Sequence, residues 1–211
     1  MKCPLNECKN GCHCLSRYYL LGVAIIAILI IWLGEFNQSL FLAINSKHGV
    51  LPDAIWDIFN FIAEPKYYIL SIILIVITFL FRREFTVRVG ILIIAYYVIF
   101  GLLKIVIGEA RPFAVLPLDS FHWINYLGEK SGKAAYKSFP SGHTGVVTIF
   151  VFTSIKLFCQ NKLWLRVLLF LLLIMVMFAR ICTGWHWPLD VLASAVIAYI
   201  LVKICLCVGK K

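Results

Sequence analysis

The stretch SFPSGHTGVVTIFVFTSIKLF, residues 138–158, opens with polar and conformationally special residues and continues as an apolar run. Ionisable groups are costly in hydrocarbon, so a histidine at the start of an apolar segment needs a physical reason. Ser141 is a favourable helix N-cap, Pro140 precedes it, and Gly142 gives a ligand close access to the backbone. The unpaired N–H groups of a first helical turn, with the helix dipole, form an anion site. The stretch therefore predicts an apolar helix whose start binds an anion beside His143.

The rest of the chain is apolar enough for an integral membrane protein. Hydrophobic residues make up 62% of the 211 residues and charged residues 14%, whereas a soluble domain is about half apolar and roughly one-quarter charged. Six continuous runs are long enough to predict spanning helices rather than barrel strands: Tyr18–Leu33, Phe61–Phe81, Arg88–Ile107, Ser141–Phe158, Leu163–Arg180 and Trp187–Cys207. We expect an all-α integral membrane fold of six transmembrane helices, with residues 1–17 as a tail and residues 18–211 as one membrane domain.

Lysine and arginine residues orient these predicted helices. With the N-terminus inside, twelve of the twenty basic residues fall in inner segments and eight on the outer side. The excess inside predicts cytoplasmic N- and C-termini, and it makes the segment at residues 112–139 an extracytoplasmic loop. The net charge of +10 suits anionic lipid head groups better than nucleic acid, because the charges are divided between both membrane faces.

The predicted cytoplasmic tail holds four of the eight cysteines, Cys3, Cys8, Cys12 and Cys14. Their spacing lacks the paired C-x2-C of a zinc ribbon, and the cytoplasm is a reducing compartment. We therefore expect free thiols near the membrane, with metal binding by the tail as the alternative.

Three polar clusters fall on the predicted outer face. They occupy residues 104–112, 140–143 and 180–190, at the ends of the third to sixth predicted helices. Arg111 and Arg180 can hold phosphate oxygens in bidentate fashion, and Lys104 adds a further cation. Convergence of these clusters on one face favours an anionic, phosphate-like ligand.

Two histidines and an aspartate add reactive groups to this face. Asp190 lies about one helical turn after His186, so its carboxylate can accept the Nδ1–H of that imidazole and leave Nε2 free as a nucleophile. His143, on another helix, is a second imidazole that can donate a proton. Together with the cations, these groups suit a phosphoryl group that undergoes transfer.

The order and spacing of the clusters resemble the three-part signature of the type 2 phosphatidic acid phosphatase superfamily. Lys104 through Pro112 matches K-x6-R-P, Pro140 through His143 matches P-S-G-H, and Arg180 through Asp190 matches R-x5-H-x3-D. The resemblance spans residues 104–190 and implies the six-helix fold of the membrane branch. One departure is Ala179, where the family usually has serine, so one supporting hydroxyl is missing.

The resemblance also implies a role for each matching residue. His186 would attack phosphorus and form a phosphohistidine, Asp190 would orient His186, and His143 would protonate the leaving oxygen. The phosphate-binding residues would be Lys104, Arg111, Ser141, Gly142 and Arg180. No metal and no cofactor are expected, because the cations would stabilise the charge that Mg²⁺ stabilises at many other phosphoryl-transfer sites.

We therefore expect a bacterial-type phosphatase in the inner cell membrane that acts on a lipid phosphate or diphosphate of the outer leaflet. Phosphatidic acid, phosphatidylglycerol phosphate, a polyprenyl diphosphate such as undecaprenyl diphosphate, and the phosphates of lipid A are the candidate substrates. The alternatives are a lipid phosphotransferase with the same site and a non-catalytic lipid-phosphate binder or transporter. A binder, however, has no need of a His–Asp pair and a second histidine. Membrane lipids are the expected partners, and the oligomeric state is left open.

Two other segments border the predicted outer face. Residues 50–61 place apolar side chains at helical spacing, with Asp53, Asp57 and Asn60 elsewhere around the wheel, which predicts a short interfacial helix. The loop at residues 112–139 is expected either to cover a bound head group or to be an ordinary solvated loop.

Three further ionisable residues near these segments receive ordinary interpretations. His48 and His122 have no partner in any motif and are interpreted as interfacial histidines. Glu109 is interpreted as an ordinary carboxylate, with tuning of Lys104 or Arg111 as the alternative.

Overall fold

The computed structural model describes residues 36–124 and 134–207, and every regular element within these ranges is helical. The α-helices are α2 (Phe36–Asn45), α3 (Asp53–Ile62), α4 (Ile69–Phe81), α5 (Thr86–Ile107), α6 (Pro112–Val115), α7 (Gly142–Phe158), α8 (Leu163–Cys182) and α9 (Pro188–Cys207). Short 3-10 helices are η2 (His48–Val50), η3 (Pro65–Tyr67) and η4 (Arg83–Phe85). The tail and the first predicted span, Tyr18–Leu33, lie outside the described residues.

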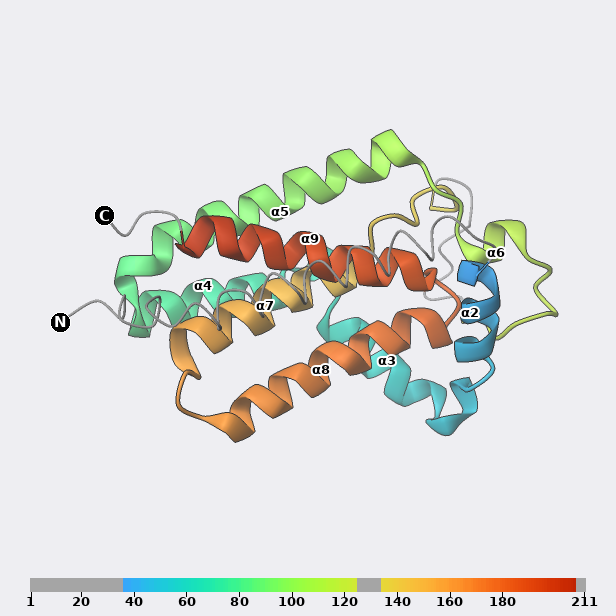
Figure 1. Cartoon of the computed structure of the whole chain (residues 1–211), viewed down its shortest axis with the longest axis horizontal. Coiled ribbons are helices and arrows are strands. Elements are labelled where there is room, and N and C mark those ends of the chain that lie inside the picture. Colours follow the sequence, from blue (N-terminus) through green and yellow to red (C-terminus); the bar gives the residue numbers. More distant parts are fainter. Residues whose placement is uncertain (1–35, 125–133, 208–211) are drawn as a thin grey trace, which may run out of the picture.

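The longer helices form a bundle around α7, which packs against α4, α5, α8 and α9. Most side chains of α7 are buried or half-buried, and the Thr148 hydroxyl bonds to the helix's own backbone, at the carbonyl of Thr144, over 2.7 Å. Figure 1 shows that α5 and α8 end where α7 and α9 begin. The chain direction of the helices therefore places all three polar clusters at one end of the bundle.

Apolar helices and an apolar outer surface identify a membrane protein. Three helical segments are long and apolar enough to cross a bilayer: Arg83–Val115, Leu163–Cys182 and Pro188–Leu206. Helices α4 and α7, with 13 and 17 residues, are apolar but shorter than the roughly 20 residues of a typical span. Large apolar side chains such as Ile72, Ile94 and Leu168 point outward, which suits contact with lipid chains. The count of six spans stays a prediction.

The predicted span Phe61–Phe81 is wrong in its first part, because the chain leaves the helical path between α3 and α4. Pro65 lacks a backbone N–H, and Tyr68 adopts a left-handed conformation with φ of 55°. Both features interrupt a continuous α-helix. The interruption brings Glu64 and Pro65 against the start of α7, where the Pro65 ring lies close to Gly142.

The predicted helix at residues 50–61 is observed as α3, but its buried face differs from the prediction. Trp56 and Asn60, one turn apart, are its buried residues, whereas Ile58 is 52% exposed. The buried face packs on α8, and Asn60 accepts a hydrogen bond from Arg180 there. A buried arginine needs an acceptor, so a polar residue occupies a position that the apolar pattern places outside.

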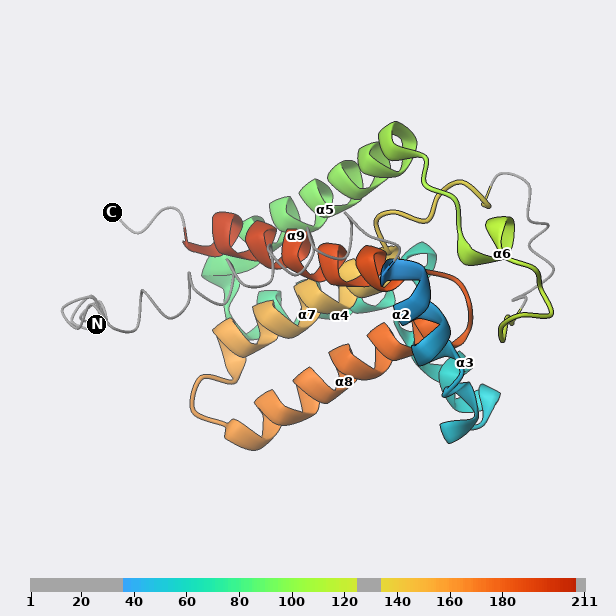
Figure 2. The same ribbon diagram turned by 45° about the vertical axis from the view of Figure 1, so that its right-hand side comes forward.

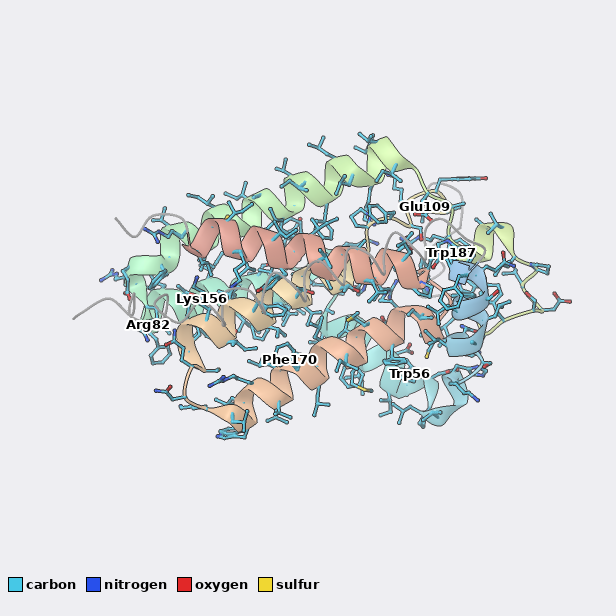
Figure 3. All side chains as sticks on the ribbon, viewed as in Figure 1. Trp56, Arg82, Glu109, Lys156, Phe170 and Trp187 are labelled. Carbon is cyan, nitrogen blue, oxygen red and sulfur yellow. The ribbon has the colours of Figure 1, made fainter. Side chains whose placement is uncertain are left out.

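The two ends of the bundle differ in their polar residues. Figure 3 shows Arg82 and Lys156 at one end, and Glu109 and Trp187 at the other. Arg82 Nε donates to a carbonyl in the last turn of α7 at 3.2 Å, and Lys156 Nζ donates to one in the last turn of α9 at 3.1 Å. Cations are favourable at helix C-termini, so these basic residues stabilise the end remote from the clusters.

Helices α5 and α7 approach closely at Gly145. A Cβ atom at this position would lie 2.4 Å from the Phe100 ring and 2.7 Å from the Tyr96 ring. Tyr96 also donates its hydroxyl proton to the carbonyl of Gly142 at 2.7 Å. The absence of a side chain at Gly145 therefore allows the contact that positions the first turn of α7.

We predict that Gly145→Ala destabilises the protein even though alanine is the better helix former by about 1 kcal/mol. The added methyl group overlaps two buried rings, and overpacking of this kind costs about 1–3 kcal/mol. Thermal unfolding in detergent measures the effect, with Gly90→Ala on α5 as the control because a Cβ there meets nothing within 4 Å. Equal or higher melting temperatures for Gly145→Ala than for the control would contradict the packing argument.

Candidate active site

The structure brings the eight predicted site residues together at one end of the bundle, where α2 and α6 also lie (Figure 2). Six of them line one cavity: Lys104, Arg111, Gly142, His143, Arg180 and His186. Ser141 and Asp190 are fully buried beside it.

A sharp connection between α8 and α9 places His186. The carbonyl of Arg180 accepts the N–H groups of both Trp185 and His186, at 3.1 and 3.2 Å. Gly184 adopts a φ of 75° in this turn, a conformation that glycine tolerates without strain. The imidazole is 1% exposed, so the turn directs it into the protein rather than toward solvent.

Arg111 and Asp190 bind opposite nitrogens of the His186 ring. Asp190 Oδ2 lies 3.2 Å from Nδ1, and Arg111 Nη1 lies 3.2 Å from Nε2. A guanidinium can only donate, so Nε2 carries the lone pair and Nδ1 carries the proton. Burial, followed by the charges of Arg111 and Arg180, holds the pKa of His186 well below its usual value. The ring is therefore the neutral tautomer that a nucleophilic Nε2 requires.

Several donors hold the Asp190 carboxylate in place. Its Oδ2 accepts the Ser138 hydroxyl at 2.5 Å and the Trp187 N–H at 3.0 Å, in addition to its contact with His186. Burial, followed by the charge of nearby Asp190, raises the pKa of Glu109 to about 8, so Glu109 is the protonated member of this pair of acids. Glu109 is therefore linked to Asp190, rather than to the cations considered in the sequence analysis.

The remaining cations are fixed by oxygen acceptors. Lys104 Nζ donates to the carbonyls of Pro140 and Lys137, at 2.6 and 3.0 Å. Arg180 Nη1 donates to Asn60 Oδ1 at 2.7 Å, and its guanidinium lies 5.6 Å from the centre of the Trp185 ring. Cations held in this way need little rearrangement to stabilise a phosphoryl group.

The first turn of α7 differs from the prediction in one detail. Ser141 occupies the N-cap position, but its side chain makes no capping hydrogen bond. Its Oγ instead accepts the hydroxyl proton of Thr144 at 3.2 Å, within the buried interior. The side chain of Ser141 therefore does not occupy the first-turn N–H groups, which suits binding of an anion at this helix start.

His143 faces a carboxylate that the sequence analysis did not identify. Its Nε2 lies 3.3 Å from Glu64 Oε2. Burial raises the pKa of Glu64, but the hydrogen bonds from His143 and the Lys66 N–H outweigh it and lower the pKa to about 2. Glu64 is thus ionised at neutral pH.

The cavity has a volume of about 750 Å³ and two kinds of wall. The basic residues and both histidines form one wall. A second group of lining residues, here called the aromatic wall, comprises Phe61, Tyr67, Tyr96, Tyr97 and Phe100. A phosphate can bind at the first wall while an apolar body lies along the second, which suits a lipid phosphate.

Three supporting residues were missed in the sequence analysis: Ser138, Asn60 and Glu64. Ser138 stands two residues before the P-S-G-H cluster and could have been suspected from that proximity. Glu64 lies in an apolar run, where an acid is unusual. Asn60 gave no signal of its own, because a polar residue on an amphipathic helix is ordinary.

The described part of the loop after α6 packs onto the α8–α9 connection. The Ile124 N–H donates to the Thr183 carbonyl at 3.2 Å, and Trp185 Nε1 donates to the Ile124 carbonyl at 2.8 Å. This segment therefore supports the site from outside, and residues 125–133 of the predicted loop lie outside the described residues.

His48 and His122, which have no partner in any motif, contact each other and Asp53 in the structure. Their rings stack at 3.9 Å, and His122 Nε2 lies 3.0 Å from Asp53 Oδ1. Asn45 donates to the His122 carbonyl at 2.9 Å and accepts its N–H at 2.8 Å. The pair attaches the loop to α2 and α3, and it lies apart from the residues that line the cavity.

Cations and histidines beside aromatic residues, at the end of an apolar helical bundle, are the arrangement expected of a membrane lipid phosphatase. Comparison with known proteins identifies the family. The PAP2 superfamily profile matches residues 85–211, and the chain belongs to this superfamily. The resemblance inferred from the three motifs is thus confirmed.

Individual relatives agree with this assignment. The chain is 35% identical over 172 residues to undecaprenyl-diphosphatase BcrC of Bacillus subtilis, covering 78% of this chain and 80% of that protein. It is 28% identical over 185 residues to an undecaprenyl-diphosphatase of Sulfolobus acidocaldarius, covering 84% of each.

Two crystal structures have the same fold. LpxE of Aquifex aeolicus superposes with a TM-score of 0.68 at 28% identity, covering 82% of this chain and 96% of that one. A PAP2 type phosphatidylglycerolphosphate phosphatase of Bacillus subtilis superposes with a TM-score of 0.67, covering 91% and 98%. At 16% identity the second likeness concerns the fold alone.

We predict that Ser138→Ala lowers kcat about tenfold, because hydrogen bonds to charged groups are worth about 1.5–3 kcal/mol and this one orients Asp190. Phosphate release by the purified variant measures the effect. Ser120→Ala is the control, since the Ser120 hydroxyl bonds only to the nearby Pro117 carbonyl among the contacts observed. Wild-type turnover in Ser138→Ala would show that the orientation of Asp190 does not depend on the Ser138 hydroxyl.

Proposed function

We propose that this protein hydrolyses a lipid phosphate or lipid diphosphate on the extracytoplasmic leaflet through a phosphohistidine on His186. The observation that carries the proposal is the environment of this imidazole. Asp190 holds Nδ1–H, and Arg111 donates to Nε2 from the cavity side. An imidazole held this way has its nucleophilic lone pair directed at a cation that would bind the phosphoryl group.

In the first half-reaction, Nε2 of His186 forms a bond to phosphorus while the bond to the leaving oxygen breaks. The cations of Lys104, Arg111 and Arg180 stabilise the charge on the phosphoryl oxygens, and His143 gives a proton to the leaving oxygen. In the second half-reaction, water attacks phosphorus, its proton passes to His143, and phosphate leaves His186. Asp190 remains ionised and Glu109 protonated throughout.

An undecaprenyl or similar polyprenyl diphosphate is the favoured substrate. Two relatives that each match most of this chain are undecaprenyl-diphosphatases. The aromatic wall of the cavity suits an unsaturated hydrocarbon chain next to the phosphate-binding wall. Phosphatidic acid, phosphatidylglycerol phosphate and lipid A phosphates remain the other substrates to test.

The proposal includes six spans in the inner membrane, cytoplasmic termini and an outward-facing site. The basic residues at the bundle end remote from the site support this orientation. A phosphotransferase is the second candidate, since an acceptor lipid in place of water at the second half-reaction would use the same residues.

The proposal is tested by phosphate release from purified protein across a panel of lipid phosphates and diphosphates, with EDTA present. We expect hydrolysis to survive EDTA and to be blocked by vanadate, which resembles the transferring phosphoryl group. Release that needs added Mg²⁺ would point to another mechanism, and phosphate transfer to a second lipid without release would favour the phosphotransferase.

The two histidines should respond differently to substitution. His186→Ala should abolish turnover of every substrate, because no phosphoenzyme forms without the nucleophile. His143→Ala should slow the hydrolysis of phosphatidic acid by about 10²–10⁴-fold, the usual effect of general acid catalysis, because its leaving group is an alkoxide. It should affect nitrophenyl phosphate much less, since nitrophenolate leaves unprotonated. Initial rates in detergent measure both effects, and equal losses in both variants on both substrates would refute this division of roles.

A further inference from the structure

Each of the two site histidines contacts a carboxylate from a different part of the chain. His186 contacts Asp190 on α9, whereas His143 contacts Glu64, which precedes η3. Glu64 lies outside the three motifs and outside residues 85–211, which match the family profile. The break between α3 and α4 brings it to the cavity, so its position is a consequence of the tertiary structure.

The pair is held by contacts on both sides. The Lys66 N–H donates to Glu64 Oε1 at 3.2 Å, which leaves Oε2 for His143. The next residue, Pro65, accepts the Tyr97 hydroxyl on its carbonyl at 3.1 Å. On the other side, Tyr96 donates to the Gly142 carbonyl at 2.7 Å. Helix α5 therefore positions both the segment of Glu64 and the helix start that carries His143.

The charges around His143 explain why a carboxylate is needed there. The charged groups that act on it are Arg180 of α8, Arg111 before α6 and Glu64, and His186, Lys104 and Tyr96 line the same cavity. Burial and the two guanidinium groups disfavour a protonated imidazole. A general acid must be protonated at the start of the reaction, so an opposing negative charge is required.

We propose that Glu64 is a positioning residue that orients His143 and favours its protonated, proton-donating form. This inference rests on the proposed role of His143 as the general acid. The Glu64 carboxylate accepts the Nε2–H and opposes the effect of burial and of the two guanidinium groups. The Nδ1 atom has no hydrogen-bond partner among residues 36–124 and 134–207, so an imidazolium keeps a second N–H for the leaving oxygen.

Glu64 itself neither gives nor takes a proton during the reaction. As the bond between phosphorus and the leaving oxygen breaks, His143 gives up one proton to that oxygen and becomes neutral. Water that attacks the phosphohistidine returns a proton to His143, and Glu64 stays ionised in both steps. Its effect is therefore on the protonation and orientation of His143, and it should appear only where the leaving group needs a proton.

Glu64→Gln tests this inference, since glutamine keeps the shape and the acceptor oxygen but removes the charge. We expect a loss of about tenfold or more on phosphatidic acid and little change on nitrophenyl phosphate. The alkaline limb of the pH–rate profile on phosphatidic acid should move to lower pH by about one unit or more, because loss of a nearby anion makes His143 release its proton more readily. Glu64→Asp keeps the charge, so the alkaline limb of its pH–rate profile should stay at the wild-type pH.

Asp57→Asn is the matched control, because Asp57 lines the same cavity as a second carboxylate and no contact between it and His143 is observed. We expect this variant to keep the wild-type ratio of the two substrate rates and the wild-type alkaline limb. A Glu64→Gln enzyme with an unshifted limb and equal losses on both substrates would overturn the inference.

The same measurements on His143→Ala separate this inference from the proposed function. If His143→Ala shows no dependence on the leaving group, the general-acid role itself fails. If His143→Ala shows that dependence and folded Glu64→Gln does not, only the role of Glu64 is wrong. Size-exclusion profiles of all variants report folding. If Glu64→Gln does not fold, the substrate rates and the pH–rate profile of Glu64→Asp are used to test the inference.

Discussion

The site depends on one buried carboxylate, that of Asp190. It lies in the first turn of α9 and accepts hydrogen bonds from the Trp187 N–H, the Ser138 hydroxyl and His186. These donors belong to the helix start, to the segment before α7, and to the α8–α9 connection. A buried carboxylate is stable only when it is paired in this way, so the three segments are held together by the requirement to satisfy it.

The cations of the site follow the same rule. Lys104 binds the backbone carbonyls of Lys137 and Pro140, Arg111 binds that of Trp185 at 2.8 Å, and Arg180 binds the Asn60 side chain. Neutral acceptors fix these groups in place. The nearby carboxylates of Glu64 and Asp190 offset part of their charge, and the remaining positive charge favours an anionic ligand.

The segment between α3 and α4 gives the site its second side. Without the break at Pro65 and Tyr68, residues 61–81 would form a continuous helix, and Glu64 and the Pro65 ring would not lie against the start of α7. The same segment contributes Phe61 and Tyr67 to the aromatic wall. One interruption of a helix thus supplies both an anion near His143 and part of the aromatic wall of the cavity.

Much of this architecture was predictable from the sequence because it depends on local patterns. Long apolar runs require helices in a membrane, and they were recognised in α5, α7, α8 and α9. Successive spans run in opposite directions across the membrane. The motif residues stand at the end of one span and the start of the next, so their position on one face could be predicted from the order of the spans. The spacing of His186 and Asp190, four residues apart across a helix start marked by Pro188, likewise predicted their contact.

Other features were decided only by the tertiary structure, since they depend on partners far apart in the chain. Asn60 is buried because Arg180, 120 residues later, needs an acceptor, and the pattern of α3 alone places Asn60 on the polar side. The Ser138 hydroxyl and the Glu109 carboxyl meet Asp190 across separate segments. Glu64 reaches His143 through a helix break whose direction no local pattern specifies. Continuous apolar runs indicate which segments form helices in the membrane, but pairing of buried polar groups depends on distances that exist only after the helices pack.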